Sequence, residues 1–271
     1  MNNNWIVKGL IIFSVSISMI TIVSTGLWLL NQTSDKCLSN TTTSGGHGEF
    51  TSFIYVGAGL CLIFSVLYLF TVLPVRQNWR HNGDQRMILA ISCCGMQLLM
   101  LILFASLYAL TQSSVGFGTL KTWISRPERW MNIKHCLYED TRVCADFQNK
   151  FADDTQDKFF HRDFTPIQSG CCKPPLECSF SYSSPTIWMK PENGTYSNHD
   201  CYEWDNNPKK LCYNCDVCKL GYAHELKNAW TISSFVVIVA WLIFVLGFIL
   251  PRVFIRNQDE VEQLIENHQL S

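Results

Sequence analysis

The sequence FVVIVAWLIFVLGFIL, residues 235–250, contains no charged residue and no proline. It lies within a longer stretch, Asn228–Pro251, that has no Asp, Glu, Lys or Arg. The hydrocarbon core of a bilayer accepts about 20 apolar residues as one α-helix. This part of the sequence therefore predicts a membrane-spanning helix.

Three other stretches share this character. Only 16% of the 271 residues are charged, against about 25% in an average soluble domain, and the shortage is concentrated in these stretches. Four buried helices of a soluble protein are the alternative, and four such stretches in one chain argue against it. The uncharged stretches are Gly9–Ser34, Phe50–Val75, Met87–Leu120 and Asn228–Pro251. The first exceeds the 7–15 apolar residues of a signal-peptide core, so we interpret it as a retained span.

We therefore predict an all-α integral membrane protein: a four-helix transmembrane bundle with a disulfide-rich, partly helical large extracellular loop between helices 3 and 4. The predicted spans are residues 9–30, 51–74, 87–110 and 230–250. The segments between and around them are a cytosolic N-terminus (1–8), a small extracellular loop (31–50), a cytosolic loop (75–86), the large extracellular loop (111–229) and a cytosolic tail (251–271).

This orientation follows from the distribution of positive charge. The small loop has Lys36 alone, whereas basic residues flank the spans on the other side: Lys8, Arg76, Arg80, Arg86, Arg252 and Arg256. Lys and Arg in short loops favour the cytosolic side. Three N-glycosylation sequons fall in the predicted outer segments, at Asn31, Asn40 and Asn193, with Asn31 the weakest because it lies almost at the membrane surface.

Ten cysteines lie in the predicted outer segments, where an oxidising compartment favours disulfides. Nine of them are in the large loop, an odd number, so one is either free or paired with Cys37. The ten disulfide candidates are Cys37, Cys136, Cys144, Cys171, Cys172, Cys178, Cys201, Cys212, Cys215 and Cys218.

The adjacent pair Cys171-Cys172 should reach two different partners, because two neighbouring cysteines bridge only with strained geometry. Gly170 supplies conformational freedom before the pair, and Pro174-Pro175 stops any helix after it. A run with helical spacing leads into the fourth span, and bridging it to this pair would anchor the middle of the loop. The run is Leu211, Cys215, Cys218, Tyr222 and Leu226.

A metal site is the rival interpretation of Cys212, Cys215 and Cys218, which resemble the start of an iron–sulfur or zinc motif. Tyr222 occupies the position of the fourth cysteine of an iron–sulfur run, and the extracellular setting favours disulfides, so we expect no metal or other cofactor. His161 with nearby Asp163 reads as a solvated face. The chain has no G-x-S-x-G, H-E-x-x-H or phosphate-loop motif, and we expect no enzymatic activity.

The large loop is long enough to form a domain. Helical patterns occupy its ends, 112–165 and 208–229, with a break near Pro127. The middle, 166–207, is rich in Pro, Ser, Asn and Gly and reads as irregular structure held by disulfides. Its aromatic residues form either a binding surface or a small core, and the sequence leaves this open. They are Phe180, Tyr182, Trp188, Tyr196, Tyr202 and Trp204.

Small and weakly polar residues line one face of each span, as in membrane helix packing. Examples are Ser14, Ser18, Thr21 and Thr25 in the first span, and Ser233, Ala240 and Gly247 in the fourth. Gln97 is the most polar group deep in a span, and we expect it to form a hydrogen bond across the bundle. No ionisable residue lies at mid-membrane, which argues against transport.

The tail sequence contains Glu260, Leu264 and Ile265 with the spacing of an acidic di-leucine sorting signal. The same residues also give an amphipathic helix with Val261, Leu264 and Ile265 on one face.

Four spans, a small and then a large outer loop, and the sequence Gly170-Cys171-Cys172-Lys173-Pro174-Pro175 resemble the tetraspanins. The GCCKP form, with CYNCDVCK at 212–219, is similar to the plant branch of that family. The sequence after Cys37 departs from the FL-x-x-P-type motif of plant members.

The resemblance implies a membrane scaffold that gathers partner membrane proteins and itself into microdomains, with links to cell differentiation and development. The expected partners are thus other membrane proteins, further copies of the chain and the lipid bilayer, and the expected location is the plasma membrane. The net charge of −1 offers no basic patch for nucleic acid. A claudin- or connexin-like junction or channel protein is the alternative, suggested by Gly26-Leu27-Trp28 before Cys37.

Overall fold

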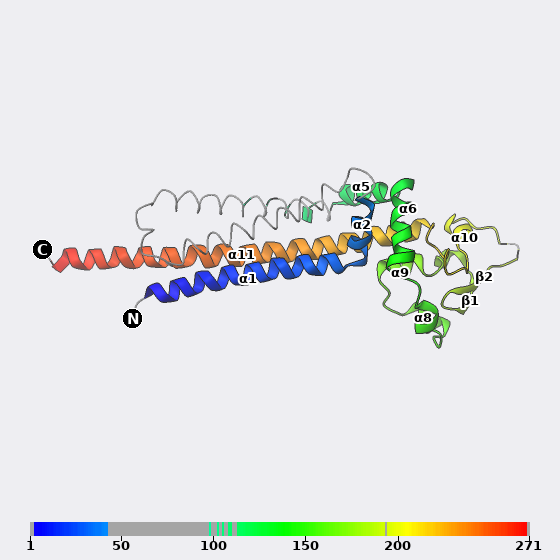
Figure 1. Cartoon of the computed structure of the whole chain (residues 1–271), viewed down its shortest axis with the longest axis horizontal. Coiled ribbons are helices and arrows are strands. Elements are labelled where there is room, and N and C mark those ends of the chain that lie inside the picture. The colour runs from blue at the N-terminus through cyan, green and yellow to red at the C-terminus, as the bar shows by residue number, and fades with distance from the viewer. Residues whose placement is uncertain are drawn as a thin grey trace. The chain divides into compact units, whose positions relative to one another are not determined.

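The computed structural model describes residues 3–42, isolated helical positions between 98 and 109, 113–192 and 194–269. Within these residues the regular elements are helices, apart from a two-stranded hairpin (Figure 1). The chain divides into two compact units. The membrane unit consists of Met1–Trp28, Phe50–Tyr108 and Ile232–Ser271, and the outer unit consists of Leu29–Glu49 and Ala109–Thr231.

In the membrane unit, α1 (Asn3–Asn31) and α11 (Asp216–Gln269) supply the described helices. Large apolar side chains on both are exposed, among them Phe13 at 64% and Phe235 at 59%. Apolar exposure of this kind on a long helix marks contact with lipid or protein. Among the described residues one helical segment, Asp216–Ile243, is long and apolar enough to cross a bilayer, and Ser16–Leu29 is a shorter apolar stretch.

Small residues pack α1 against α11 in this unit. Ser18 is buried and donates its hydroxyl to the carbonyl oxygen of Ala240, which is also buried, at 3.0 Å. Thr21 and Thr25 donate to carbonyl oxygens one turn earlier on α1, which satisfies hydroxyls that lipid would leave unpaired. The predicted packing face of small residues is present at these positions.

The spans predicted over 51–74 and 87–110 lie outside the described residues, apart from isolated helical positions such as Leu98 and Ile102. The fourth predicted span lies within α11, which continues through Pro251 to Gln269. The tail predicted over 251–271 is therefore helical as far as Gln269.

The outer unit begins with α2 (Thr33–Thr42) and continues with α5 (Ser114–Ile124) and α6 (Pro127–His135). Pro127 is the first residue of α6, so the predicted helix break is confirmed, because proline fits a first turn whose N–H groups are unpaired. A π-helical turn, Cys136–Asp140, follows α6 and packs with it against α2. The remaining short elements are α7 (Phe147–Lys150), α8 (Gln156–Phe160), α9 (Pro166–Cys171), a 3₁₀ turn (Leu176–Cys178), β1 (Ser181–Ser184), β2 (Ile187–Met189) and α10 (Asp200–Glu203).

The hairpin pairs β1 and β2 antiparallel, with Tyr182 opposite Trp188. The outer edge of β2 is occupied by a side chain: Asn206 accepts a hydrogen bond from the Trp188 N–H and donates one to the Trp188 carbonyl, both at 3.0 Å. The backbone groups of Trp188 that face away from β1 are thereby satisfied.

The core of the outer unit is aromatic around α7 and α8. Phe147, Phe151 and Phe159 pack edge to face, with ring centroids 5.1–6.1 Å apart. Beside them the carboxylate of Asp154 is 2% exposed and accepts hydrogen bonds from Arg162 at 2.8 and 2.9 Å. The fold thus provides hydrogen-bond donors for the buried carboxylate of Asp154.

Candidate functional site

The ten outer cysteines form five disulfides, which hold the outer unit together. Cys37 of the small loop pairs with Cys136, so the odd cysteine of the large loop is bonded to the small loop. Cys171 and Cys172 reach different partners, Cys218 on α11 and Cys144 after the π-helical turn. The other two bridges join Cys178 to Cys201 and Cys212 to Cys215.

This pairing leaves Cys212, Cys215 and Cys218 unavailable as metal ligands, since their sulfurs belong to two different bridges. Among the described residues no group of three or more His, Cys, Asp or Glu side chains is arranged to hold a metal ion. His161, considered above with Asp163, is 79% exposed and faces Asp157.

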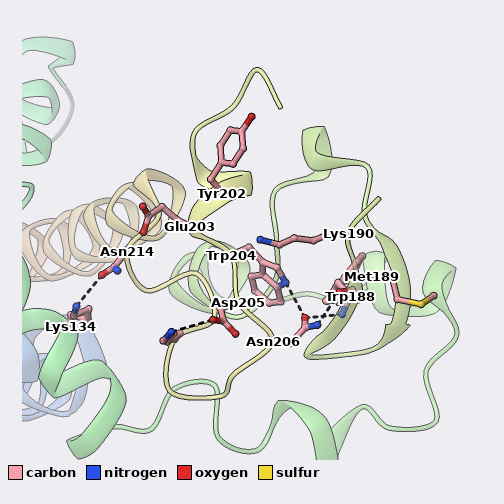
Figure 2. Close-up of a pocket in the computed structure, with 11 residues that line it drawn as sticks. Lys134, Trp188, Met189, Lys190, Tyr202, Glu203, Trp204, Asp205, Asn206 and Asn214 are labelled. Atoms are coloured by element: carbon pink, nitrogen blue, oxygen red, sulfur yellow. Dashed lines mark hydrogen bonds and ion pairs between the residues drawn. The ribbon is translucent and has the colours of Figure 1, made fainter. Parts of the chain in front are cut away.

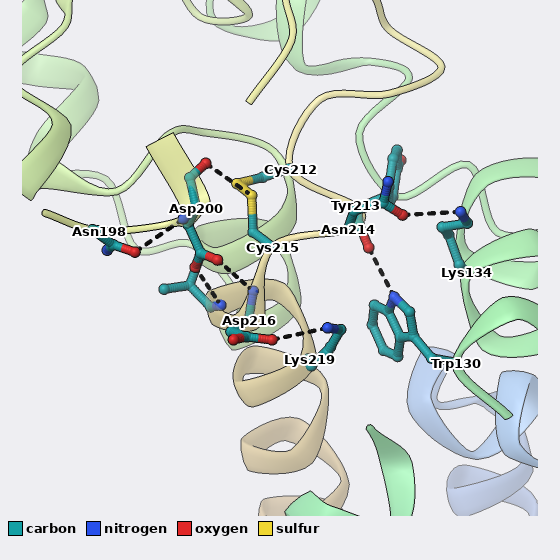
Figure 3. Close-up of polar contacts among 11 residues, drawn as sticks. Trp130, Lys134, Asn198, Asp200, Cys212, Tyr213, Asn214, Cys215, Asp216 and Lys219 are labelled. Atoms are coloured by element: carbon teal, nitrogen blue, oxygen red, sulfur yellow. Dashed lines mark hydrogen bonds and ion pairs between the residues drawn. A yellow bond between two sulfur atoms is a disulfide. The ribbon is translucent and has the colours of Figure 1, made fainter. Parts of the chain in front are cut away.

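A buried aspartate fixes where α11 begins (Figure 3). Asp200 on α10 is 3% exposed, and its carboxylate accepts hydrogen bonds from the N–H groups of Asp216 and Val217 at 2.8 and 2.9 Å. A carboxylate at this point satisfies unpaired helix N–H groups and complements the helix dipole. The helical run predicted from Leu211 therefore starts later, at Asp216, and Leu211 itself has a left-handed backbone, φ 36°.

The loop before α11 is tied to α6 by two contacts (Figure 3). Trp130 donates its indole N–H to the carbonyl of Tyr213, and Lys134 donates to the amide oxygen of Asn214, both at 2.9 Å. Residues 211–215 are thus held between α6, α10 and their own disulfide.

Two glycines let α9 and α11 meet at backbone distance. A Cβ on Gly170 would collide with the carbonyl of Val217, and one on Gly221 would collide with the carbonyl of Pro166. The prediction that Gly170 supplies conformational freedom was wrong: the residue is part of α9 and its φ is not left-handed, and what it supplies is room. The Cys171–Cys218 bridge, with Cα atoms 4.4 Å apart, lies beside this crossing.

Lys173, which follows the adjacent cysteines, covers the aromatic core. Its ammonium lies over the rings of Phe160 and Phe164, 5.5 and 5.3 Å from their centroids. Burial lowers the pKa of the Lys173 ammonium. The lysine of the GCCKPP sequence therefore contributes packing.

An open hollow of about 980 Å³ lies on the outer unit (Figure 2). Trp188 and Trp204, both buried, line it, and the exposed side chains of Met189, Lys190 and Tyr202 lie around it. Tyr202 is 56% exposed, but its hydroxyl accepts a hydrogen bond from the Tyr196 N–H at 3.0 Å, so the ring is held in place. A rigid exposed aromatic ring beside apolar and cationic groups is typical of protein-binding hot spots.

Charge around the hollow is predominantly positive once its ion pair is discounted. Lys210 lies 3.4 Å from the carboxylate of Asp205, and these charges offset each other. Lys134 and Lys190 remain, against Glu203. The hollow therefore favours a partner group that carries negative charge.

The six aromatic residues of segment 166–207 divide between the two interpretations that the sequence left open. Phe180, Trp188 and Trp204 are buried, and Tyr182 and Tyr196 are half-buried in packing contacts. Tyr202 alone among these six is exposed, so most of them form core and one is available for contact. Sequence reasoning missed Met189, Lys190 and Lys134, and helical or strand periodicity gave no signal for them.

The other predicted sites are only partly described. Asn31 is exposed at the end of α1, and Asn40 lies near the end of α2. Asn193 and Gln97 lie outside the described residues. Glu260, Leu264 and Ile265 lie on the last part of α11, where the backbone alone is described.

Comparison with known proteins gives one family. The model of the Tetraspanin family matches residues 5–257. The chain is 29% identical to Tetraspanin-8 of Arabidopsis thaliana over 257 residues, 88% of this chain and 87% of that protein. It is 39% identical to Tetraspanin-7 and 32% identical to Protein TORNADO 2 of the same plant, over about half of each chain (47% of both for Tetraspanin-7; 52% of this chain and 51% of TORNADO 2). No solved structure matches it.

Proposed function

From the premise that this chain belongs to the tetraspanin family, a family of non-enzymatic multi-pass membrane proteins, we propose that it is a scaffold that gathers partner membrane proteins, and itself, into microdomains. The family match over residues 5–257 argues against the claudin- or connexin-like alternative. The finer parts of the proposal are a plasma-membrane location with both termini in the cytosol, and a role in cell differentiation and development.

The observation that carries the proposal is the hollow beside Tyr202 on a disulfide-held platform. Three of the five bridges hold segment 166–207: Cys178–Cys201 closes a loop within it, and Cys144–Cys172 and Cys171–Cys218 tie it to the segments on either side. A surface held rigid before binding loses less conformational entropy when a partner docks. This favours recognition of defined partners through the hollow.

Further features support parts of the proposal. We propose N-glycans at Asn40 and Asn193, with Asn31 a weaker site, a hydrogen bond of Gln97 across the bundle, and sorting through Glu260, Leu264 and Ile265. Each rests on the sequence patterns described above.

The test is a matched pair of double variants in the full-length chain. Met189→Ala with Lys190→Glu changes the hollow, whereas Leu176→Ala with Lys209→Glu makes the same chemical changes at exposed positions outside it. Membrane proteins that co-purify with the wild-type chain in mild detergent are identified and quantified for each variant.

We expect the first variant to lose a defined set of partners about tenfold or more, since hot-spot residues contribute 2 kcal/mol or more, and the second to retain them. Equal loss in both variants would place recognition elsewhere. A wild-type chain with neither partners nor self-association would overturn the scaffold itself.

A further inference from the structure

The helix α2 carries two buried polar side chains, each with one unpaired oxygen. Ser34 is fully buried and Asp35 is 6% exposed, and among the described residues neither Ser34 Oγ nor Asp35 Oδ2 has a hydrogen-bond partner. The other carboxyl oxygen, Asp35 Oδ1, accepts a hydrogen bond from the indole N–H of Trp230 on α11 at 3.1 Å. Burying an ionised carboxylate with an unpaired oxygen costs far more free energy than burying the neutral acid.

Within residues 3–42, 113–192 and 194–269, Asp35 forms no ion pair with lysine, arginine or histidine. Burial raises the pKa of the Asp35 carboxyl from 3.8 to about 7, and the hydrogen bond from Trp230 opposes only part of that rise.

The ionisable group beside Asp35 on α11 is the phenol of Tyr222. It is fully buried and donates its hydroxyl to the carbonyl of Ser34 at 2.6 Å. Burial raises the pKa of the Tyr222 hydroxyl well above its ordinary value, and the negative charges of Asp35 and Glu225 raise it further, so the phenol stays neutral. The remaining titratable and charged groups of the packed elements within the outer unit are Lys36 on α2; Glu128, Arg129, Lys134 and His135 on α6; Tyr138, Glu139 and Asp140 on the π-helical turn; and Asp216, Lys219, His224, Glu225 and Lys227 on α11.

Apart from the backbone, the covalent attachment of α2 to the rest of the outer unit within the described residues is the Cys37–Cys136 bridge. Two hydrogen bonds join α2 to α11, one at the Ser34 carbonyl and one at the Asp35 carboxyl, and α2 also packs against α6 and the π-helical turn. A change of charge at Asp35 therefore acts on the contact that docks α2 on α11.

We propose that Asp35 is a proton-operated latch: with the carboxyl protonated, α2 stays docked on α11, and with the proton released to solvent, α2 loosens around its tether to Cys136. This regulation goes beyond the scaffold role and does not depend on it.

The direction of the pH dependence follows from the raised pKa. The stabilisation of the docked state is fully present below pH 3.8 and is lost as pH rises through about 7. If the loosened state restores the ordinary pKa, the docking equilibrium changes by about tenfold or more between pH 5 and pH 8.

The test measures how fast a phosphine reductant opens the Cys37–Cys136 bridge of the full-length protein in nanodiscs at pH 5 to 8. Released thiols are trapped after an acid quench and mapped by peptide. The rate is divided by that of Cys178–Cys201 in the same sample, which removes the reagent's own pH dependence; cysteines of both bridges are buried, at 0–2% exposure.

We expect this ratio to rise about tenfold across the range in the wild type. Asp35→Asn, a neutral mimic of the protonated acid, should keep the ratio low at every pH, and Asp146→Asn, at an exposed aspartate, should behave as the wild type. Trp230→Phe removes a hydrogen bond that lowers the pKa of Asp35, so it should move the midpoint to higher pH and still report if Asp35→Asn fails to fold. A flat wild-type ratio, or a pH profile unchanged in Asp35→Asn, would overturn the latch.

Discussion

Two buried aspartates of the outer unit, Asp154 and Asp35, are held in opposite ways. Asp154 accepts hydrogen bonds from Arg162 and Lys158, which lower the pKa of its carboxyl to about 2. Asp35 has one indole donor and an unpaired oxygen, and burial raises its pKa to about 7. Above pH 7 one of these acids favours the fold as an anion, and the other opposes it.

The same contrast applies to the regions around them. Segment 144–218 is held by four of the five disulfides, its buried acids Asp154 and Asp200 are paired or cap a helix end, and Gly170 permits backbone contact. The α2 region is held by one disulfide, by packing against α6 and the π-helical turn, and by polar contacts with α11 that include the unpaired acid Asp35. The comparison suggests a fixed display surface and an adjustable attachment within one unit.

The largest loss of stability should come from removing Cys171–Cys218, which closes a longer loop than Cys212–Cys215. Cys171→Ser with Cys218→Ser opens a bridge spanning 47 residues, and Cys212→Ser with Cys215→Ser opens one spanning 3. Chain entropy gives losses of roughly 4 and roughly 1.5 kcal/mol in the free energy of unfolding. Thermal unfolding of both variants in detergent, followed by circular dichroism, measures the difference. Equal losses would show that loop length does not govern stability at this end of α11.

A smaller difference in stability, with opposite signs, is expected between alanine substitutions at two glycines. Gly170→Ala meets the backbone of Val217 and should destabilise the outer unit by about 1–3 kcal/mol. Gly118 lies in the interior of α5 with open space around it. Gly118→Ala should therefore leave the stability of the outer unit unchanged or raise it by up to about 1 kcal/mol. The two melting temperatures, each compared with the wild type, test this. A tolerated Gly170→Ala would mean that α9 and α11 can separate without loss.

The smallest effect should appear in acid. Because the folded pKa of Asp154 is depressed, its stabilisation is present above the ordinary pKa of 3.8 and is lost as pH falls towards 2. Asp154→Asn should therefore have a melting temperature that depends less on pH between 2 and 5 than that of the wild type. The measurement is thermal unfolding at several pH values in that range, and an unchanged acid slope would assign acid sensitivity to other carboxyls.

Sequence reasoning succeeded where a local rule was sufficient. The four uncharged stretches together with the GCCKPP sequence led to the family, Pro127 marked a helix break, and the adjacency of Cys171 and Cys172 required two partners. Each of these three inferences depends on neighbours in the chain or on the thickness of the bilayer, and none requires knowledge of the tertiary structure.

It failed where the cause lies far away in the sequence. The start of α11 at Asp216 is set by Asp200, and the need for glycine at position 170 is set by Val217. The hollow is lined by both Lys134 of α6 and Lys190 beside the hairpin, and no periodic pattern in the sequence connects these two residues. The partner of Cys37 was left open for the same reason.

The side-chain amide of Asn206 is hydrogen-bonded to the backbone N–H and carbonyl of Trp188, which face away from β1. An exposed strand edge invites further strands, whether from a partner or from another copy in a crowded membrane. Because this position is already filled, neighbouring molecules cannot extend the hairpin there and must recognise side chains instead. A scaffold of the kind proposed above is thereby protected, at this edge, against assembling into sheets.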